Sequence, residues 1–189
     1  MKNLLNLLLF LSIPLSASSI IYTSSYIDVI NENVLKNSSI TVDDGIITSI
    51  DSGYIKVKQT DTLIDLRGKT LMPGLMDMHV HFGGEYQSKA QRPIKTERET
   101  EAILATLHAS VTLKAGFTTV RQVGDSGLVA ISLRDAINAG HVIGPRIFTS
   151  GKSIATTGGH ADPTNGMSSD SYEYPVPEDG VINLSLIHI

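Results

Sequence analysis

The hydrophobic pattern of this 189-residue chain changes near residue 71, and the change restricts the folds that the chain can adopt. Between residues 19 and 71, short β-branched segments are separated by turn residues. Asp43-Asp44-Gly45 lies between two such segments, at 39–42 and 46–50, and predicts a hairpin because these residue types tolerate the positive φ of a tight turn. No residue in this region indicates chemistry. We therefore expect residues 19–71 to form strands with a structural role.

Downstream of residue 71 the period becomes helical. Apolar residues recur at three- and four-residue spacing over 96–115 and over 128–139, and a glycine follows each of these segments. β-branched segments at 117–120 and 146–150 come after the two helices. Strands and helices that alternate at this spacing are typical of βαβ units around a parallel sheet. The sequence therefore predicts an α/β protein.

Composition excludes several classes of function. The chain has 15 Lys and Arg against 19 Asp and Glu, a formal net charge of −4, and no basic cluster, which argues against a nucleic-acid partner. It has no cysteine, so neither a disulfide framework nor a cysteine-ligated zinc site is available. Hydrophobic residues make up 41% of the chain, an ordinary share for a folded globular protein.

The first eighteen residues have the order of a secretory signal peptide. Lys2 precedes an apolar run from Leu4 to Leu15, and the small residues Ser16-Ala17-Ser18 follow. The run is too short to cross a bilayer, which takes about 20 residues, so we expect no stable membrane anchor. A core helix is the alternative. The charged start and the small-residue exit favour a signal peptide at 1–18 and a periplasmic or secreted protein.

The chemistry of the chain is concentrated in Asp77-Met78-His79-Val80-His81, which follows a Pro-Gly pair and precedes a Gly-Gly pair. Alternate residues of a strand share a face, so Asp77, His79 and His81 are expected on one side, with the histidine Cα atoms roughly 6.6 Å apart. Both imidazoles can then bind one ion at about 2.1 Å, and Asp77 can orient one of them. The alternative is a pair of exposed or core histidines without a ligand. The flanking glycines at a strand end favour metal binding.

With these residues in view, the sequence resembles the metal-dependent amidohydrolase superfamily. The later matching segments look most like the branch that contains imidazolonepropionase-like proteins and dipeptidases acting on Xaa-Pro or related peptides. The segments that carry the resemblance are 65–68, 71–75, 77–81, 115–121, 144–147, 151–154 and 157–162.

The resemblance implies a fold and a reaction. The fold is the N-terminal part of a TIM-type (β/α)8 barrel at 72–183, preceded at 19–71 by strands of a small β-sandwich. The cofactor is one or two divalent metal ions, usually zinc, with His79 and His81 as ligands of the more buried ion. Hydroxide made available by the metal near neutral pH attacks an amide carbonyl, and an acidic residue passes the proton to the leaving nitrogen. The implied substrate is a small molecule or dipeptide.

Some parts of the family pattern are absent from this sequence. The bridging residue, two further histidine ligands and the catalytic aspartate would lie beyond residue 189, and a complete barrel typically takes about 250 residues. The arginine-aspartate pair often found after the second strand reads Arg121-Gln122. Lys152 lies in a glycine-flanked loop and is not a bridging residue. We therefore expect a truncated chain that is inactive alone. A noncatalytic binding or remnant protein on the same scaffold is the alternative.

Two smaller expectations concern the C-terminal part. His160 follows Gly158-Gly159 in a loop that can face the mouth of the barrel, and we consider it either a substrate-binding residue or a loop histidine with local hydrogen bonds. Residues 184–189 do not continue the family pattern, and one reverse translation of them resembles the transposon end used in sequencing adapters. A frayed apolar tail is the alternative. We expect these six residues to be a foreign tail.

Overall fold

The computed structural model describes residues 17–83, 98–125, 128–162, 164–165, 168, 170 and 180–182. The expected signal peptide at 1–18, apart from its last two residues, and the expected tail at 184–189 lie outside the described residues. The chain divides into two units, Met1–Pro73 and Gly74–Ile189. Among the described residues, no helix is long and apolar enough to span a membrane.

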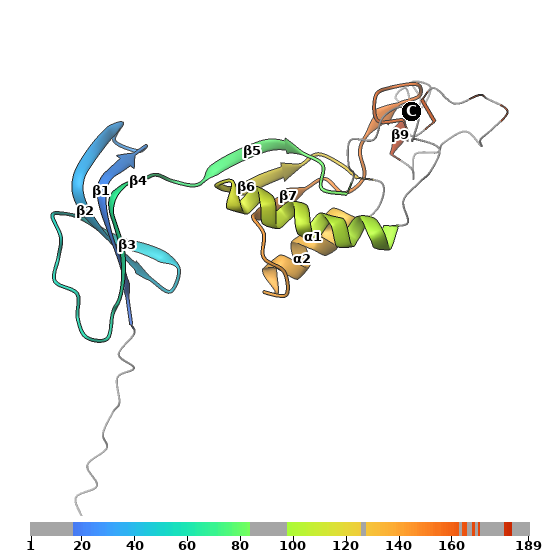
Figure 1. Cartoon of the computed structure of the whole chain (residues 1–189). Helices are drawn as coiled ribbons and strands as arrows, with labels where there is room; N and C mark the ends of the chain where they lie inside the picture. The colour runs from blue at the N-terminus through green and yellow to red at the C-terminus, as the bar shows by residue number, and fades with distance from the viewer. Residues whose placement is uncertain are drawn as a thin grey trace, which may run out of the picture. The chain divides into compact units, whose positions relative to one another are not determined.

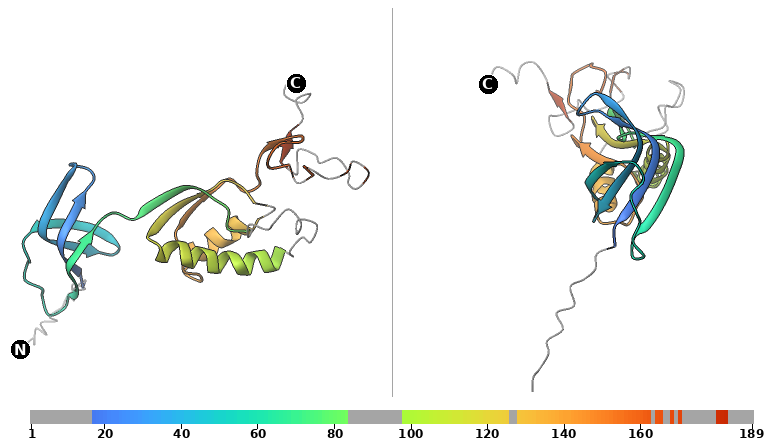
Figure 2. Two further views of the ribbon diagram at one scale, coloured as in Figure 1. Left: turned by 45° about the horizontal axis from the view of Figure 1, so that its top comes forward. Right: turned by 90° about the vertical axis from the view of Figure 1, so that its left-hand side faces the viewer.

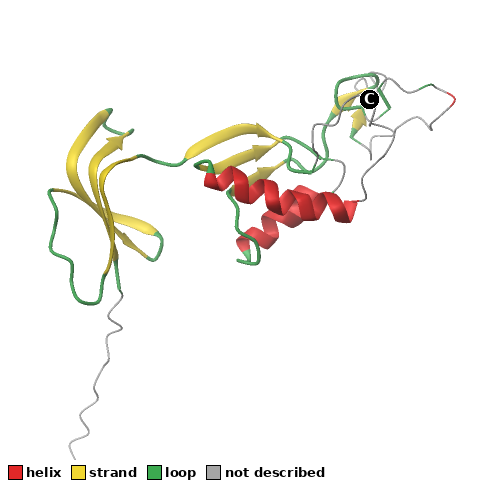
Figure 3. Cartoon of the chain, viewed as in Figure 1, coloured by secondary structure: helices red, strands yellow, loops and turns green. Residues whose placement is uncertain are grey.

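The first unit is a four-stranded sheet (Figure 3). Its strand order is β3-β2-β1-β4, in which β1 runs antiparallel to β2 and parallel to β4, and β2 runs antiparallel to β3. Asp44 and Gly45 both take positive φ, 48° and 78°, at the tight turn between β2 and β3, so the expected hairpin is confirmed. The strands are β1 (Ser19–Asp28), β2 (Asn33–Asp43), β3 (Ile46–Ser52) and β4 (Thr62–Leu71).

Buried hydroxyl groups connect this sheet to the loops beside it. Thr23 is wholly buried, and its hydroxyl donates to the Lys69 carbonyl at 2.9 Å. Ser39 is also buried; its hydroxyl donates to the Gly53 carbonyl at 2.7 Å and accepts from the Ile55 amide at 3.0 Å. A buried hydroxyl without partners would cost free energy. The Thr23 bond therefore helps to hold β1 against β4, and the Ser39 bonds fix the start of the loop between β3 and β4.

The second unit contains the parallel sheet that the sequence predicts, and the α/β fold class is confirmed. Three parallel strands lie in the order β5-β6-β7, and helices α1 and α2 both lie on one face of them (Figures 1 and 2). A short parallel pair, β8 with β9, follows. The elements are β5 (Leu75–Val80), α1 (Arg98–Lys114), β6 (Phe117–Gln122), α2 (Val129–Asn138), β7 (Arg146–Thr149), β8 (Ala155–Thr156) and β9 (Val181–Ile182).

One hydrophobic core joins the two helices to the sheet. Val120 of β6 is wholly buried and Ile147 of β7 is nearly so, and both face the helices. Phe82, just after β5, is buried in the same cluster, which ties the end of β5 to the core. The remaining buried members are Ala105 and Ala109 of α1 and Val129 and Leu133 of α2. Because Val120 and Ile147 face the helices, the residues that alternate with them along β6 and β7 lie on the opposite face of the sheet.

The face of helix α1 that packs against the core is not the face that carries its largest apolar side chains. Ile103, Leu107 and Val111 recur at helical spacing, but their side chains are 57–70% exposed. Ala105 and Ala109, equally four residues apart, are wholly buried instead. A methyl side chain lets the helix backbone approach the sheet closely, which a row of branched side chains would prevent. The apolar period thus predicts the helix correctly, whereas it does not reveal which face packs.

A charged pair in the first unit provides a pH-dependent test of this fold. Arg67 donates two hydrogen bonds from Nε to the Asp65 carboxylate, at 2.9 and 3.0 Å, and one from Nη2 at 2.5 Å. Its guanidinium lies 5.8 Å from the Tyr22 ring centre and 5.6 Å from that of Tyr54. The Arg67 guanidinium lowers the pKa of Asp65 to about 2.

We expect the stabilisation from this pair to be complete above the ordinary carboxyl pKa of 3.8 and to be lost as the pH falls towards about 2. Replacing Arg67 by Gln removes the guanidinium and keeps the backbone N–H that also donates to Asp65, so the carboxyl pKa of Asp65 should rise part of the way towards 3.8 in a ¹³C NMR titration. The matched control, Lys36→Gln, removes a positive charge from the same unit and should leave the Asp65 pKa unchanged. An Asp65 titration that is the same in both variants and in the parent would contradict the pairing.

Candidate metal centre

Parallel pairing brings the carboxyl ends of three strands together. Val80 at the end of β5 pairs with Gln122 at the end of β6, and Gln122 pairs with Thr149 at the end of β7. Loops that leave this edge therefore start close to one another, which is where α/β barrels carry their sites. The histidine pair lies at this edge: His79 is the penultimate residue of β5, and His81 follows the strand directly.

The structure brings the two predicted metal ligands together. The Nε2 atoms of His79 and His81 lie 3.3 Å apart, and the rings are inclined by 68°. Two nitrogens on one tetrahedral zinc ion, each at about 2.05 Å, would be separated by about 3.4 Å. Both side chains are exposed, so an ion can reach them. The residues present therefore fit a shared divalent ion, and the distance also allows a direct hydrogen bond between the rings.

The second nitrogen of His81 has a fixed partner. Its Nδ1 lies 2.8 Å from the Gly124 carbonyl oxygen. A carbonyl only accepts, so Nδ1 carries the proton, and Nε2 keeps the lone pair that a metal requires. Asp77, considered above as the orienting group, accepts from the backbone N–H of His79 at 3.0 Å and makes no bond to either ring among the described residues. The backbone carbonyl of Gly124, two residues after β6 ends, thus orients the ring.

Gln122 is a site residue that sequence reasoning missed. Its side chain is wholly buried; Oε1 accepts from the Phe82 amide at 3.0 Å, and Nε2 donates to the Gly124 carbonyl at 3.1 Å. In the sequence, Gln122 stands out only because it replaces the aspartate of the family's arginine-aspartate pair. The available signal was its position: a polar residue two places after Val120, on the face that packs against the helices, needs buried partners.

The loop with His160 is organised by Asp162. The Asp162 carboxylate accepts from the Gly158 amide at 2.7 Å and from the Thr164 amide and hydroxyl at 2.8 and 2.7 Å. These bonds, the Thr164 hydroxyl first and then the Gly158 amide, hold the pKa of Asp162 below its usual value. His160 is an exposed turn residue in this loop, and within the described residues no hydrogen bond or ring contact joins it to His79 or His81.

The other titratable residues near the strand ends have structural roles. Asp125 accepts from the Ala130 amide at 2.6 Å in the first turn of α2, and it pairs with Lys152 in an isolated β-bridge. His108 of α1 donates from Nδ1 to the Phe82 carbonyl at 3.1 Å. In the described part of the chain, no group of three or more His, Asp or Glu side chains is placed to hold a metal ion. The histidine pair is therefore the candidate centre that the described residues offer.

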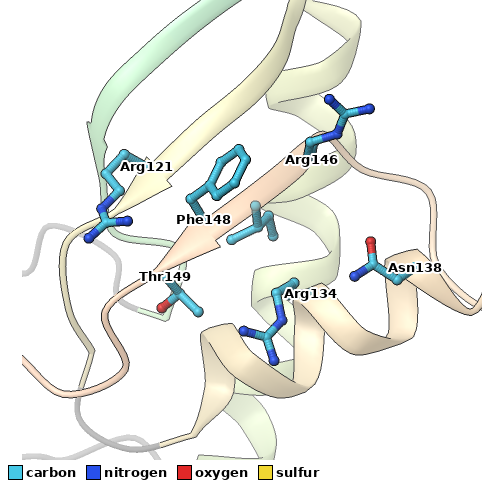
Figure 4. A pocket seen from close by; sticks show the side chains of 7 residues that line it. Arg121, Arg134, Asn138, Arg146, Phe148 and Thr149 are labelled. Atoms are coloured by element: carbon cyan, nitrogen blue, oxygen red, sulfur yellow. The ribbon is translucent and has the colours of Figure 1, made fainter.

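A cavity beside β7 is lined by different chemical groups from those of the histidine pair. It has a volume of about 420 Å³ and is lined by side chains of β6, α2 and β7 (Figure 4). Arg121, Arg134 and Arg146 make its lining cationic, so it lacks the imidazole and carboxylate groups that bind divalent ions. The other lining residues are Asn138, Ile147, Phe148 and Thr149.

Several known proteins are similar to this chain in fold, in sequence or in both. A solved Xaa-Pro dipeptidase with methionine bound in its active site is 63% identical, with a TM-score of 0.83 over 88% of this chain and 41% of the dipeptidase. A prolidase solved with N-methylphosphonate-L-proline is 27% identical, with a TM-score of 0.70 over 85% of this chain and 38% of the prolidase. Ochratoxinase of Aspergillus niger is 28% identical over 136 residues, 68% of this chain and 27% of that enzyme.

The three parallel strands and the helices on one face of them correspond to part of the α/β barrel of the matched structures. The model of the amidohydrolase family matches residues 70–182, more than half of the chain, so the chain belongs to the amidohydrolase family. The expected resemblance is therefore confirmed at the level of the family, and Xaa-Pro dipeptidase and prolidase structures are among the matches. The chain spans less than half the length of each of the three proteins described above.

Gly124 allows a sharp test of this architecture. Its φ is +147°, and a Cβ added there would lie 2.0 Å from the Ser153 Oγ and 2.6 Å from the Ser153 Cα. Both backbone strain and overlap with a neighbouring backbone therefore oppose any side chain. We expect Gly124→Ala to lower the free energy of unfolding by about 2–4 kcal/mol in urea denaturation.

The matched control is Gly116→Ala. Gly116 also takes positive φ, +96°, but nothing lies within 4 Å of an added Cβ. That variant should show the cost of the backbone conformation alone, about 1–2 kcal/mol. Equal losses for the two variants would mean that the close approach of Ser153 to Gly124 is not maintained in solution.

Proposed function

We propose that the protein carrying this chain is an exported, metal-dependent amidohydrolase that cleaves the C–N bond of small amide or dipeptide substrates. The observation that carries the proposal is the 3.3 Å separation of the His79 and His81 Nε2 atoms at the carboxyl edge of a parallel sheet. Membership of the amidohydrolase family supports it independently. Because the chain spans only part of its relatives, the activity is proposed for the protein in which the remaining strands of such a barrel are present.

The roles of the residues follow from their contacts. His79 and His81 would hold a divalent ion, with zinc favoured by a pair of imidazole nitrogens, and one or two ions in the complete site. When bound, such an ion lowers the pKa of water and polarises a carbonyl. The Gly124 carbonyl holds the His81 ring with its Nε2 beside that of His79, where the two nitrogens would hold the ion. His160 would contact substrate from its exposed turn, whose course Asp162 fixes.

A dipeptidase is the favoured member of this class. The support is similarity: the 63% identical solved structure is a Xaa-Pro dipeptidase, and a prolidase also matches. Dipeptides with proline at the second position are therefore the first substrates to assay. The rival function, a noncatalytic binding protein on the same scaffold, predicts a folded protein without metal-dependent turnover.

We expect His79→Ala and His81→Ala, made in the full protein, each to lose at least one bound metal ion per chain and to lower kcat/KM at least 10³-fold. Each removes one of the two imidazole ligands that this chain would contribute to the ion, and a site that loses a ligand binds its metal much more weakly. Metal content is measured by plasma mass spectrometry and turnover by release of proline from Met-Pro.

The matched control is His141→Ala, which removes an exposed histidine outside the pair and should change neither quantity. His160→Ala should retain the metal and raise KM. Residues 19–189 alone should show no turnover, because the described residues supply two ligands. A full protein that retains its metal after both substitutions in the pair would refute the assignment, and a metal-free, inactive full protein would support the binding-protein alternative.

Export is tested separately. With its own N-terminus in a bacterial host, the protein should appear in the periplasm or medium with a mature chain that starts at Ser19, as measured by intact mass. Leu8→Arg places a charge in the apolar run and should keep the protein in the cytoplasm with residues 1–18 attached. An uncleaved chain in the cytoplasm for both versions would contradict export.

A further inference from the structure

The backbone N–H and carbonyl of Phe82, the residue that follows His81, are each held by a side chain. The Phe82 amide, which belongs to that peptide group, donates to Gln122 Oε1 at 3.0 Å. The Phe82 carbonyl accepts from His108 Nδ1 at 3.1 Å, and the Phe82 ring is buried in the core. These contacts fix the direction in which the chain leaves β5. The Cα–Cβ bond of His81 is thereby fixed as well.

The same Gln122 side chain also reaches the group that orients the His81 ring. Gln122 Nε2 donates to the Gly124 carbonyl at 3.1 Å, and that carbonyl accepts from His81 Nδ1 at 2.8 Å. A carbonyl oxygen has two lone pairs, so it can accept both hydrogen bonds at once. One amide therefore joins the backbone of His81 to the acceptor that sets the ring's orientation.

The orientation of the Gln122 amide is determined by its partners. If Oε1 and Nε2 were exchanged, an NH₂ group would face the Phe82 N–H, and an oxygen would face the Gly124 oxygen. The side chain is wholly buried, so no water competes for these bonds, and the residue has no freedom to exchange partners. The backbone at Gly124 packs closely against Ser153, which restricts movement of the acceptor carbonyl.

The geometry points to Gln122 as a positioning residue for the metal centre. It holds the His81 backbone and the His81 ring acceptor in one arrangement, so that Nε2 of His81 stays beside Nε2 of His79 before any ion binds. This inference rests on the proposed function, because it requires that the histidine pair binds the metal. It adds a residue that touches neither metal nor substrate and acts through Gly124 and Phe82.

The test is Zn²⁺ affinity of the full protein, measured by competition with a chelating indicator. Gln122→Met keeps the size and shape of the side chain and removes both hydrogen bonds. We expect it to bind Zn²⁺ about 10-fold more weakly, the lower end of the range for removing a partner of a ligand. The absorption spectrum of the Co²⁺ form should shift as well, because the coordination geometry of His81 is no longer fixed.

The matched control is Val120→Ala, which creates a cavity at a wholly buried position two residues earlier on β6. It should lower stability while leaving the Zn²⁺ affinity and the Co²⁺ spectrum of the folded protein unchanged. Equal weakening in both variants would show that Gln122 acts only through general stability, which overturns the inference.

Two outcomes separate this inference from the proposed function. If His81→Ala binds Zn²⁺ as the parent does, the metal assignment fails. If His81→Ala loses Zn²⁺ and Gln122→Met does not, only the positioning role fails. Should Gln122→Met not fold, hydrogen exchange on the unmodified protein decides: the Gln122 side-chain amide protons should be strongly protected, and exchange as fast as that of an exposed glutamine overturns the inference.

Discussion

Parallel pairing of β5, β6 and β7 is the constraint on which the second unit depends. Parallel strands need crossover connections, and here these are α1 and α2, which must bury one side against the same face of the sheet. The buried contacts of Val120 and Ile147 with the helices follow directly. The pairing also makes Val80, Gln122 and Thr149 neighbours at one edge. Residues far apart in sequence thus meet where the histidine pair lies.

The features that follow from local pattern were predictable. The hairpin at Asp44-Gly45, the helix that became α2 and the strand that became β6 each depend on residues within one short segment. Helix α1 was predictable as a helix, but its buried face was not, because Ala105 packs for reasons of distance to the sheet and not of hydrophobicity. Alanine gives almost no apolar signal in a sequence, although it allows the closest approach.

The candidate site divides in the same way. His79 and His81 share a spacing that a strand converts into proximity, so the sequence alone indicates the pair. Their supporting groups come from β6 and the segment after it. The Gly124 carbonyl carries no side-chain signal, and Gln122 bonds to Phe82, which lies 40 residues earlier in the chain. Asp77 had the expected spacing but bonds to its own strand's backbone. Backbone acceptors and cross-strand amides become visible only when the register is known.

The environment of Gly124 has a genetic consequence. Every single-base missense change of a glycine codon introduces a side chain with a Cβ, and any Cβ at this position would overlap Ser153. Every single-base missense substitution at residue 124 is therefore expected to be destabilising, whichever amino acid results. Gly158 also takes positive φ but has nothing within 4 Å of an added Cβ, so substitutions there meet only backbone strain. Two glycines with positive φ thus differ widely in how much sequence variation a lineage can accumulate.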